Sequence, residues 1–320
     1  MSGCRICGGA IARTAMVREM MFGTRQPFAY ALCGDCGSWQ IVTIPADLAT
    51  YYGAGYLSHQ PGIFGHSVPP WQRWLRRLRA RAALGARSPV GTLLNRWRGE
   101  PQFGQQWLRQ AGIGLHSRIL EVGTGAGMRL QHLAQLGFRH LVGQDLFSLM
   151  ADSDSDGIRW TRAPLHTLEP GFDWIEAHHA FEHFPDPVTD LTRLRELLHP
   201  GGGLLLRVPL IDSDAAEEYG TDWVQWDAPR HLYLFTRRAL EQLAQRCGLR
   251  LALRVDDSGP FGFWGSWLYR QDIPLNDPRA SVHGPSVHCP AERWAAFEAQ
   301  ARAANAAGRG DQAAFVFVRD

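Results

Sequence analysis

The feature that most limits how this chain can fold is a strand, a glycine-rich turn, a helix and a second strand in direct succession. A mainly apolar run at 118–122 precedes Gly-Thr-Gly-Ala-Gly at 123–127, and apolar residues then recur at helical spacing over 128–136. A second apolar run over 138–143 follows and ends at Asp145. Such a unit buries its strands between helices, so the sequence predicts an α/β sheet.

The glycines and Asp145 are typical of a nucleotide site. Glycines let the backbone approach a ligand closely, and a carboxylate at the end of the second strand can accept hydrogen bonds from two ribose hydroxyls. The spacing is Gly-x-Gly-x-Gly, which fits the carboxypropyl group of a nucleoside amino acid better than a dinucleotide pyrophosphate. A simple helix-start turn is the alternative explanation of the glycines.

Four cysteines near the start of the chain have the spacing of a metal site. They form two Cys-x-x-Cys pairs separated by twenty-five residues: Cys4, Cys7, Cys33 and Cys36. Two such turns let four thiolates converge tetrahedrally on one Zn²⁺, and a glycine directly follows each pair. Two disulfides or redox pairs are the alternative. With short strands expected at 28–32 and 39–44, the pattern predicts a zinc ribbon over residues 1–45, whose metal is structural or contacts a substrate or partner.

Residues 46–100 are expected to form a helical linker rich in tyrosine and arginine. All 33 basic residues of the chain are arginine, which excludes lysine-dependent chemistry, and residues 71–98 hold eight of them without one acid. Apolar residues at helical spacing predict an amphipathic helix with a core-facing stripe: Trp71, Trp74, Leu75, Leu78 and Ala82. The basic charge could be a solvated face, or it could attract phosphates, nucleic acid or, through residues 71–84, an anionic membrane surface.

The composition is that of a folded, enzyme-sized protein. With 320 residues, of which 45% are apolar and 20% charged, the chain can bury a sizeable core. No window approaches the roughly 20 apolar residues of a membrane span, and the first residues lack the basic and then apolar pattern of a signal peptide. A cytoplasmic location is therefore expected.

Residues 121–127, Glu-Val-Gly-Thr-Gly-Ala-Gly, resemble the first motif of the class I S-adenosylmethionine-dependent methyltransferases, small-molecule branch. Further stretches that resemble this family are 172–176 with 180–187, 197–202 with 204–209, and 226–236. The resemblance covers residues 101–320 and implies a Rossmann-like, seven-stranded sheet with helices on both faces. Members of this kind often carry a zinc ribbon and a Tyr-Tyr-x-x-x-Tyr linker, here Tyr51, Tyr52 and Tyr56.

The resemblance also implies which residues bind S-adenosylmethionine. These are Glu121, Gly123, Thr124, Gly125, Gly127, Asp145, Leu146, Ala163 and His179. Glu121 would hold the methionine amino group, the glycines would line the methionine side, and Asp145 would bind the ribose. Many members have an acid after the third strand that contacts the adenine amine. This chain has Arg162-Ala163-Pro164 there, so backbone groups near Ala163 are one option and the adenine contact stays open.

Methyl transfer to a hydroxyl or amine needs a base near the acceptor, and histidine has a suitable pKa. The candidates follow the fourth and fifth expected strands: His179, His183, Arg230 and His231. We expect His231 or His179 to be the base and Arg230 to bind an anionic group of the acceptor. Alternatively, these residues only anchor loops, and His183 bonds to backbone. His179 and His183 also have metal-ligand spacing, but a third ligand at diagnostic spacing is lacking.

The resulting expectation is a methyltransferase that acts on a small polar acceptor or glycan. Members of the family that the chain resembles often belong to surface-polysaccharide or secondary-metabolite pathways, so the resemblance implies a sugar-derived acceptor. Oxygen is the favoured acceptor atom, and nitrogen and carbon stay open. One rival is an RNA methyltransferase that binds RNA through the ribbon and the arginine-rich linker, although the histidine-rich loop argues against a nucleic-acid substrate. The other rival is a non-catalytic scaffold that only binds the cofactor. The sequence does not indicate an oligomeric state.

Overall fold

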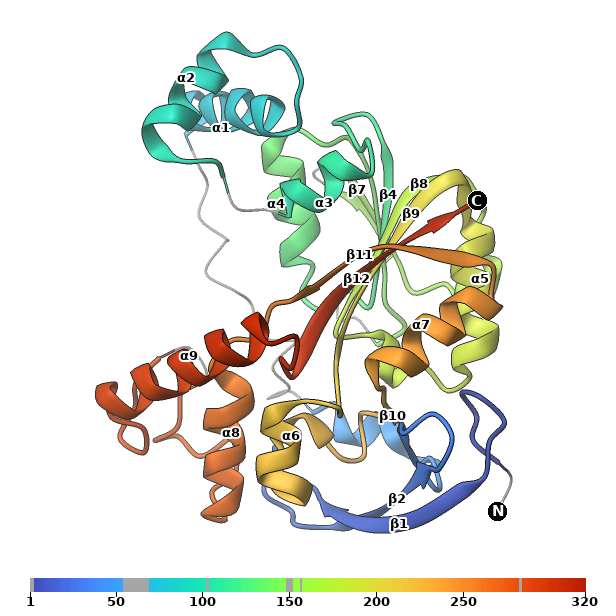
Figure 1. The fold of residues 1–320 in the computed structure, drawn as a ribbon. Coiled ribbons are helices and arrows are strands. Elements are labelled where there is room, and N and C mark those ends of the chain that lie inside the picture. The colour runs from blue at the N-terminus through green and yellow to red at the C-terminus, as the bar shows by residue number, and fades with distance from the viewer. Residues whose placement is uncertain (1–2, 54–68, 102–103, 148–151, 156, 282–283) are drawn as a thin grey trace.

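A central eight-stranded sheet runs through the computed structural model, which describes residues 3–53, 69–101, 104–147, 152–155, 157–281 and 284–320 (Figure 1). In spatial order the strands are β11 (Leu249–Asp256), β12 (Gln312–Arg319), β9 (Leu198–Pro209), β8 (Phe172–His178), β4 (Arg118–Val122), β5 (His140–Gln144), β7 (Ile158–Thr161) and β6 (Ser153–Ser155). β12 is antiparallel to both neighbours and β6 is antiparallel to β7, whereas β9, β8, β4, β5 and β7 pair in parallel. The seven expected strands are confirmed, and β6 is an additional edge strand that the sequence does not predict.

Side chains of the central strands alternate between two buried layers. Ile119 and Trp174 belong to one layer, and their chain neighbours Leu120 and Ile175 belong to the other. The first layer packs against α3 (Gln105–Gln110) and α4 (Met128–Leu136), and the second against α5 (Pro187–Leu197) and α7 (Arg237–Arg246). Because successive strand residues face opposite sides, a strand that is apolar throughout must be covered on both faces. The expected helices on both faces are therefore confirmed.

A second, four-stranded antiparallel sheet contains the expected ribbon. In spatial order its strands are β1 (Ile11–Arg18), β2 (Pro27–Cys33), β3 (Trp39–Ile41) and β10 (Tyr233–Leu234). The two strands expected between and after the cysteine pairs correspond to β2 and β3, although β3 ends three residues earlier than expected. β1 and β10 are not predicted from the sequence. Since β10 lies nearly two hundred residues beyond β3, the ribbon sheet is completed by the large domain.

The arginine-rich segment forms a helical hairpin of α1 (Pro70–Ala83) and α2 (Pro89–Arg98) (Figure 1). The expected helix is confirmed, but the expected core-facing stripe is wrong for its tryptophans, since Trp71 is 62% and Trp74 57% exposed. The end of the helix is buried instead, through Ala80 and Ala83, where α1 packs against α4. Helical spacing identifies one face of a helix, but it does not tell how much of its length another element covers.

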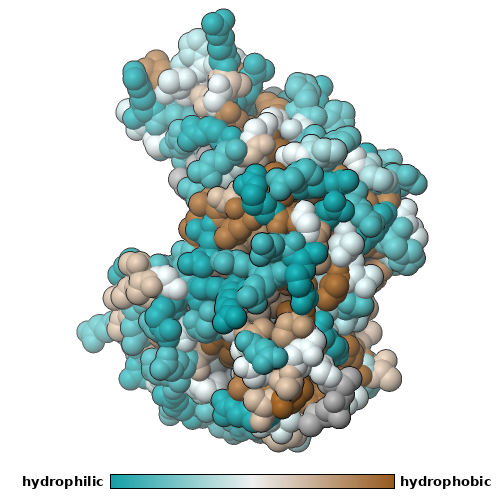
Figure 2. All heavy atoms as spheres, turned by 45° about the vertical axis from the view of Figure 1, so that its right-hand side comes forward, coloured by the Kyte–Doolittle hydropathy of each residue, from teal (hydrophilic) through white to brown (hydrophobic). Residues whose placement is uncertain are grey.

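Figure 2 shows one side of the molecule, which is mostly hydrophilic and has separate hydrophobic patches at mid-height and near the lower end. Exposed large apolar side chains of the hairpin are Trp71, Trp74, Val90, Leu93 and Trp97. None of the helices in the described ranges combines the length and the apolar character that crossing a membrane requires.

The remaining α-helices pack against one another and, through the 3₁₀ turn that follows the first of them, beside β1 of the ribbon sheet. They are α6 (Asp214–Tyr219), α8 (Phe261–Arg270) and α9 (Ala291–Ala306), with the 3₁₀ turns η6 (Gly220–Asp222) and η7 (Val224–Trp226). Trp264 of α8 is fully buried, and its ring centre lies 5.8 Å from that of Trp294 on α9. The aromatic helix α8 therefore contributes to the hydrophobic core.

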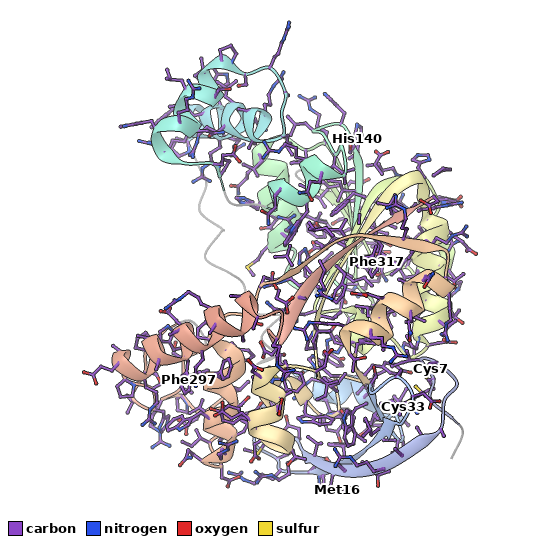
Figure 3. All side chains as sticks on the ribbon, in the orientation of Figure 1. Cys7, Met16, Cys33, His140, Phe297 and Phe317 are labelled. Atoms are coloured by element: carbon purple, nitrogen blue, oxygen red, sulfur yellow. The ribbon has the colours of Figure 1, made fainter. Side chains whose placement is uncertain are left out.

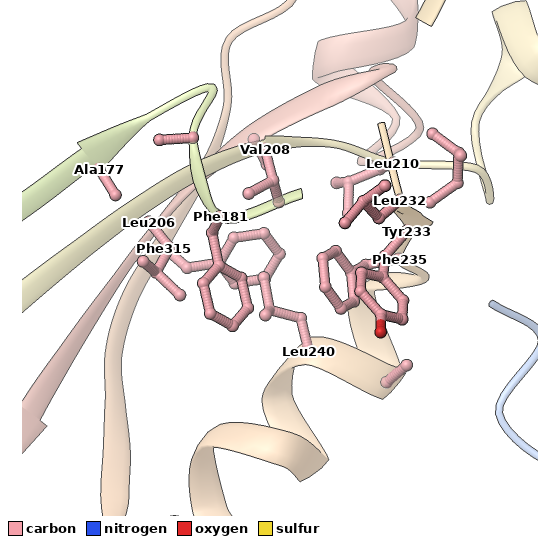
Figure 4. Packing of buried hydrophobic residues seen from close by; sticks show 14 of the residues in the cluster. Ala177, Phe181, Leu206, Val208, Leu210, Leu232, Tyr233, Phe235, Leu240 and Phe315 are labelled. Atoms are coloured by element: carbon pink, nitrogen blue, oxygen red, sulfur yellow. The ribbon is translucent and has the colours of Figure 1, made fainter. Parts of the chain in front are cut away.

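An aromatic cluster joins the two sheets at the end of β8 (Figure 4). Phe181, in the 3₁₀ turn η5 (Phe181–His183), stacks on Phe235 with ring centres 5.5 Å apart. Phe235 in turn stacks on Tyr233 of β10 at 5.8 Å. Because all three rings are fully buried, the turn that follows β8 is fixed by the core.

Candidate active site

The glycine turn after β4 has backbone angles that favour glycine. Gly123, Gly125 and Gly127 have φ angles of 72°, 52° and 70°. A Cβ on Gly123 would lie 2.5 Å from the Cβ of Ala180, and a Cβ on Gly127 would lie 2.4 Å from the ring of Trp160. The turn therefore needs glycine both for its backbone angles and for space.

Asp145, directly after β5, is held toward this turn by backbone hydrogen bonds. Its carboxylate accepts the N–H of Gly125 at 2.8 Å and the N–H of Phe147 at 2.8 Å. The preceding residue, Gln144, donates its side-chain amide to the carbonyl of Ala163 at 2.9 Å. The ends of β4, β5 and β7 are thus fixed to one another by polar contacts as well as by the sheet.

Glu121 is buried next to a second carboxylate. Glu176 on β8 accepts two hydrogen bonds from Arg129, at 2.8 and 3.1 Å, and a third from the Trp174 indole at 3.1 Å. Glu121 accepts the backbone N–H of Leu130, and its Oε2 atom has no hydrogen-bond partner among the described residues. Burial and the nearby Glu176 raise the pKa of Glu121 well above its ordinary value, although Arg129 opposes this shift.

A cavity of about 710 Å³ lies at the carboxyl ends of β4, β5 and β8. This is where open α/β sheets bind their ligands, and the volume is ordinary for a small-molecule site. Six of the expected site residues line it: Gly123, Gly125, Asp145, Leu146, His179 and His183. Six others are not on its wall: Glu121, Thr124, Gly127, Ala163, Arg230 and His231.

Another part of the cavity wall comes from residues that the sequence does not single out as site residues. Ile44 and Leu48, which follow the ribbon, lie there with Tyr52 and with Phe184 near the start of α5. The ring of Tyr52 stacks on that of Phe147 with centres 5.4 Å apart and planes 7° apart. The tyrosine motif is a usable signal for Tyr52, whereas nothing in the sequence distinguishes Ile44 or Leu48. Tyr56 lies outside the described residues.

Three imidazoles surround the fully buried carboxylate of Glu182, in the turn after β8. His179 Nδ1 lies 3.5 Å and His231 Nε2 lies 3.8 Å from Glu182 Oε1. The ring centre of His183 is 4.7 Å from that of His231. Burial acts to raise the pKa of Glu182, but His179, His231 and His183 outweigh it and lower the pKa overall. The four residues therefore form one polar cluster beneath the cavity.

The two inner histidines of this cluster are oriented by backbone carbonyls. His231 Nδ1 is 2.7 Å from the carbonyl oxygen of Gln225, and His183 Nδ1 is 2.8 Å from that of Arg230. Burial, reinforced by the neighbouring His183, lowers the pKa of His231 to about 4. His183 bonds to backbone as the alternative reading of that residue expects, but it also lines the cavity.

In this geometry Arg230 is held by other residues of the chain, as the loop-anchoring alternative expects. Its side chain is 0% exposed and forms ion pairs with Asp227 at 2.6 Å and with Glu19 at 2.9 Å. It also donates to the carbonyl of Tyr51 at 3.1 Å. Arg230 therefore ties the loop before β10 to the ribbon and to the segment after it, and an anion in the cavity has no access to it. His231, which is buried and off the cavity wall, is likewise poorly placed to reach an acceptor directly.

The four expected zinc ligands lie together in the ribbon, and Figure 3 labels two of them, Cys7 and Cys33. Their sulfur atoms are all within 4.8 Å of one another, with Cys4 and Cys36 3.8 Å apart and Cys7 and Cys33 3.4 Å apart. A disulfide bond is about 2.05 Å long, so none of these pairs is bonded. Backbone N–H groups point at Cys4, Cys7 and Cys33, as they do toward thiolates. The arrangement fits a tetrahedral zinc site and excludes the two-disulfide alternative in this structure.

The ribbon contacts the loop that carries His231 at several points. The Tyr30 hydroxyl donates to the carbonyl of His231 at 2.8 Å, and the backbone N–H of Ile41 donates to the carbonyl of Leu232 at 2.9 Å. The Thr236 hydroxyl donates to the carbonyl of Cys36 at 2.8 Å. The position of this loop thus depends on the ribbon.

Comparison with known proteins agrees with this architecture. A family model described as a methyltransferase domain matches residues 70–253. The ubiquinone biosynthesis O-methyltransferase of Cereibacter sphaeroides is 30% identical over 186 residues, which are 52% of this chain and 73% of that protein. A tRNA U34 carboxymethyltransferase of Chromohalobacter salexigens is 27% identical over 164 residues, 45% of this chain and 47% of that protein.

Among solved structures, an S-adenosylmethionine-dependent methyltransferase of Mesorhizobium loti aligns with a TM-score of 0.43 and 17% identity. The alignment covers 68% of this chain and 98% of that one.

Proposed function

This chain belongs to the methyltransferase-domain family of S-adenosylmethionine-dependent enzymes, and we propose that it methylates a hydroxyl group of a small acceptor bound in the cavity. One observation carries the proposal. The cavity is lined by the glycine turn and Asp145, by His179 and His183, and by Tyr52. Such a site has room for a cofactor and an acceptor in contact with each other, which is the arrangement that methyl transfer requires.

The residues present fit S-adenosylmethionine. Gly123 and Gly125 line the cavity and have no side chain, and Asp145, directly after β5, lines it as well. The unpartnered oxygen of Glu121 fits the methionine ammonium group, reached directly or through water. We assign Gly123 and Gly125 to the methionine part and Asp145 to the ribose. When bound, the cofactor supplies a methyl group already activated by its sulfonium charge.

His179 is the base that the geometry favours. It lines the cavity, its side chain is about one-third exposed, and its Nδ1 atom faces the Glu182 carboxylate at 3.5 Å. The acceptor proton would pass to His179, and Glu182 would stabilise the imidazolium that results. His179 has a positive φ of 50°, a strained conformation for a histidine that occurs more often at functional sites.

The cavity wall favours an acceptor built on a ring. Ile44, Leu48, Phe184 and Leu232 are apolar, and Tyr52 adds an aromatic face. Both sugar derivatives and phenols have an apolar ring face and a hydroxyl at its edge, so both fit this wall. The sugar-derived acceptor stays our expectation, and the relative named for ubiquinone biosynthesis makes a phenol the natural second class to assay.

The ribbon cysteines would hold one structural Zn²⁺. Four sulfur atoms within 4.8 Å, with no bonds between them and backbone N–H groups directed at them, are the donor set of a closed tetrahedral site. The ion would stabilise a module whose own core is small.

Labelled S-adenosylmethionine tests the proposal. The protein would be incubated with methyl-labelled cofactor and with fractionated lysate, a set of sugar nucleotides, a set of phenols, and total RNA. We expect label in small molecules. Label confined to RNA would overturn the proposal in favour of RNA methylation, and cofactor binding without transfer to any fraction would favour a scaffold.

The His179→Gln variant tests the base. Loss of a general base typically lowers kcat by roughly 10²–10⁴-fold, and we expect this loss with little change in cofactor affinity. His199→Gln is the matched control, because His199 is an exposed histidine of β9 away from the cavity. Equal turnover of both variants would show that His179 is not the base.

A further inference from the structure

Glu182 is a buried carboxylate without a proper partner. Its side chain is 0% exposed, and neither of its oxygens has a hydrogen-bond partner among the described residues. The nearest ring nitrogens, those of His179 and His231, lie at 3.5 and 3.8 Å, beyond good hydrogen-bond distance. Burying a carboxylate in this way is costly unless a cation or several donors compensate it.

The Nε2 atoms of His231 and His183 carry lone pairs rather than protons. A carbonyl oxygen only accepts hydrogen bonds, so the Nδ1 atoms of His231 and His183 must carry the protons that reach Gln225 and Arg230. The Tyr52 hydroxyl also lies 3.0 Å from His183 Nδ1, but the proton that the Arg230 carbonyl requires stays on that nitrogen. Each neutral ring then has its lone pair on Nε2. Metal-binding histidines are typically oriented in this way, with the other ring nitrogen donating to a carbonyl.

We propose that Glu182, His183 and His231 bind a divalent transition-metal ion of the Zn²⁺ or Co²⁺ type. One carboxylate oxygen and one nitrogen from each ring all lie within 4.8 Å of one another. Metal–ligand bonds of about 2.1 Å place tetrahedral donors about 3.4 Å apart, so modest side-chain rotation closes the site. Two imidazoles and one carboxylate are a donor set that borderline metals prefer.

The site is open on one side. Glu182 and His231 are buried beneath the cavity, whereas His183 lines it, so three protein ligands leave a position that faces the cavity. Three protein ligands with an open position are typical of catalytic rather than structural metal sites. Asp227, whose carboxylate lies 3.9 Å from His231 Nε2, adds negative charge next to the ion.

An ion at this site would bind the acceptor hydroxyl, and this part of the inference rests on the proposed function. The ion would lower the pKa of the hydroxyl and hold its oxygen beside the cavity. The released proton would pass to His179, which lines the same cavity and is not one of the three ligands. The ion would thus activate the acceptor hydroxyl, and His179 would accept its proton.

Metal binding is tested without substrate or methyl transfer. The full-length protein, with zinc already in the ribbon, would be titrated with Co²⁺ and with Zn²⁺ in a calorimeter, and bound metal would be counted by mass spectrometry. We expect a second equivalent in the wild-type protein. Co²⁺ at this site has no sulfur ligand, so its spectrum should lack the thiolate charge-transfer bands of cobalt bound to the cysteines.

Glu182→Gln and His183→Gln should weaken the second equivalent by about tenfold or more while leaving one ribbon zinc, and His199→Gln should bind like the wild type. His183 is partly exposed, so its variant remains informative if replacing the buried Glu182 prevents folding. Absence of a second equivalent with both metals, or equal binding by all variants, would overturn the proposal. Failure of methyl transfer with intact metal binding would instead count against the proposed function.

Discussion

The Glu121 carboxyl combines two opposed roles. It lies at 5% exposure beside Glu176, and the Arg129 guanidinium forms its two strong hydrogen bonds with Glu176 instead. Because burial and Glu176 raise its pKa, Glu121 destabilises the fold whenever it is ionised. The same unsatisfied oxygen is what we assign to the cofactor ammonium group. Glu121 therefore lowers the stability of the fold but provides a carboxylate for cofactor binding.

Glu121→Gln should stabilise the cofactor-free protein, and more so at high pH. The folded pKa lies above the unfolded value, so the folded state binds more protons and wild-type stability falls as pH rises through the shifted range. The variant lacks this titration, so its advantage in urea unfolding should grow from pH 5 to pH 8. Calorimetry should show cofactor binding weakened by roughly tenfold or more, the loss of a charge-assisted hydrogen bond.

Glu292→Gln, a change of an exposed carboxyl on α9, is the control for this prediction. A Glu121 variant that gains no stability at pH 8, or that keeps full cofactor affinity, would contradict the roles described for this residue.

Residues whose role depends on local backbone could be predicted from sequence, and those whose role depends on distant partners could not. The glycine turn and Asp145 are fixed by a strand–turn–helix unit of 28 residues, 118–145, whose parts are adjacent in the chain. Arg230 pairs with the nearby Asp227, but it is also held by Glu19, more than two hundred residues away. The third donor near Glu182 and His183 is His231, on another loop, so no local spacing reveals it.

Two helix N-caps show how elements are tied together. Asp186 caps α5 by accepting the backbone N–H groups of Val188 and Thr189. Thr236 caps α7 by accepting the N–H of Ala239 at 3.1 Å, and its hydroxyl also donates to the carbonyl of Cys36. Only the second cap joins a helix to the cysteine cluster.

Thr236→Val and Asp186→Ala should both lower the free energy of unfolding by about 1 kcal/mol, the usual cost of a lost cap. Only Thr236→Val should also speed the loss of ribbon zinc to a chelator, because it alone removes a bond to the Cys36 turn. A colorimetric chelator assay measures this rate. Equal rates for the two variants would mean that the contact with Cys36 does not hold the cysteine turn.

Long elements with clear periodicity were predictable, whereas short edge strands were not. β4, α4 and β9 have apolar patterns that reflect burial in the central sheet. β6 has three residues and β10 two, too few for a pattern, and each exists because a neighbouring strand offers free backbone groups. The exposed face of Trp71 and Trp74 was predicted wrongly because packing against α2 and α4 covers only part of α1.

At the scale of the whole molecule, the zinc ribbon and the methyltransferase domain share a sheet. β3 of the ribbon pairs with β10, and Tyr30, Ile41 and Arg230 cross the same boundary. Cavity residues Ile44, Leu48 and Tyr52 directly follow the ribbon. Loss of the ribbon structure should therefore also destabilise the methyltransferase domain.

Removing the ribbon zinc should lower the melting temperature of the whole chain by at least about 5 °C in one cooperative transition. The Glu182→Gln variant is the appropriate background, because it lacks the second proposed metal. Differential scanning calorimetry with and without chelator measures the shift. A catalytic-domain transition that stays at the same temperature while the ribbon melts separately would show that the two parts are independent.

The pairing of β3 with β10 also has a consequence for synthesis of the protein. β1, β2 and β3 leave the ribosome before β10, which completes their sheet and follows only after most of the large domain has been translated. At 5–20 residues per second, those roughly 190 residues take on the order of 10–40 s to appear. During this interval the backbone edge of β3 and the apolar rings of Tyr30 and Trp39 lack their native cover. Zinc bound early by the four cysteines would stabilise the three-stranded ribbon until β10 has been synthesised.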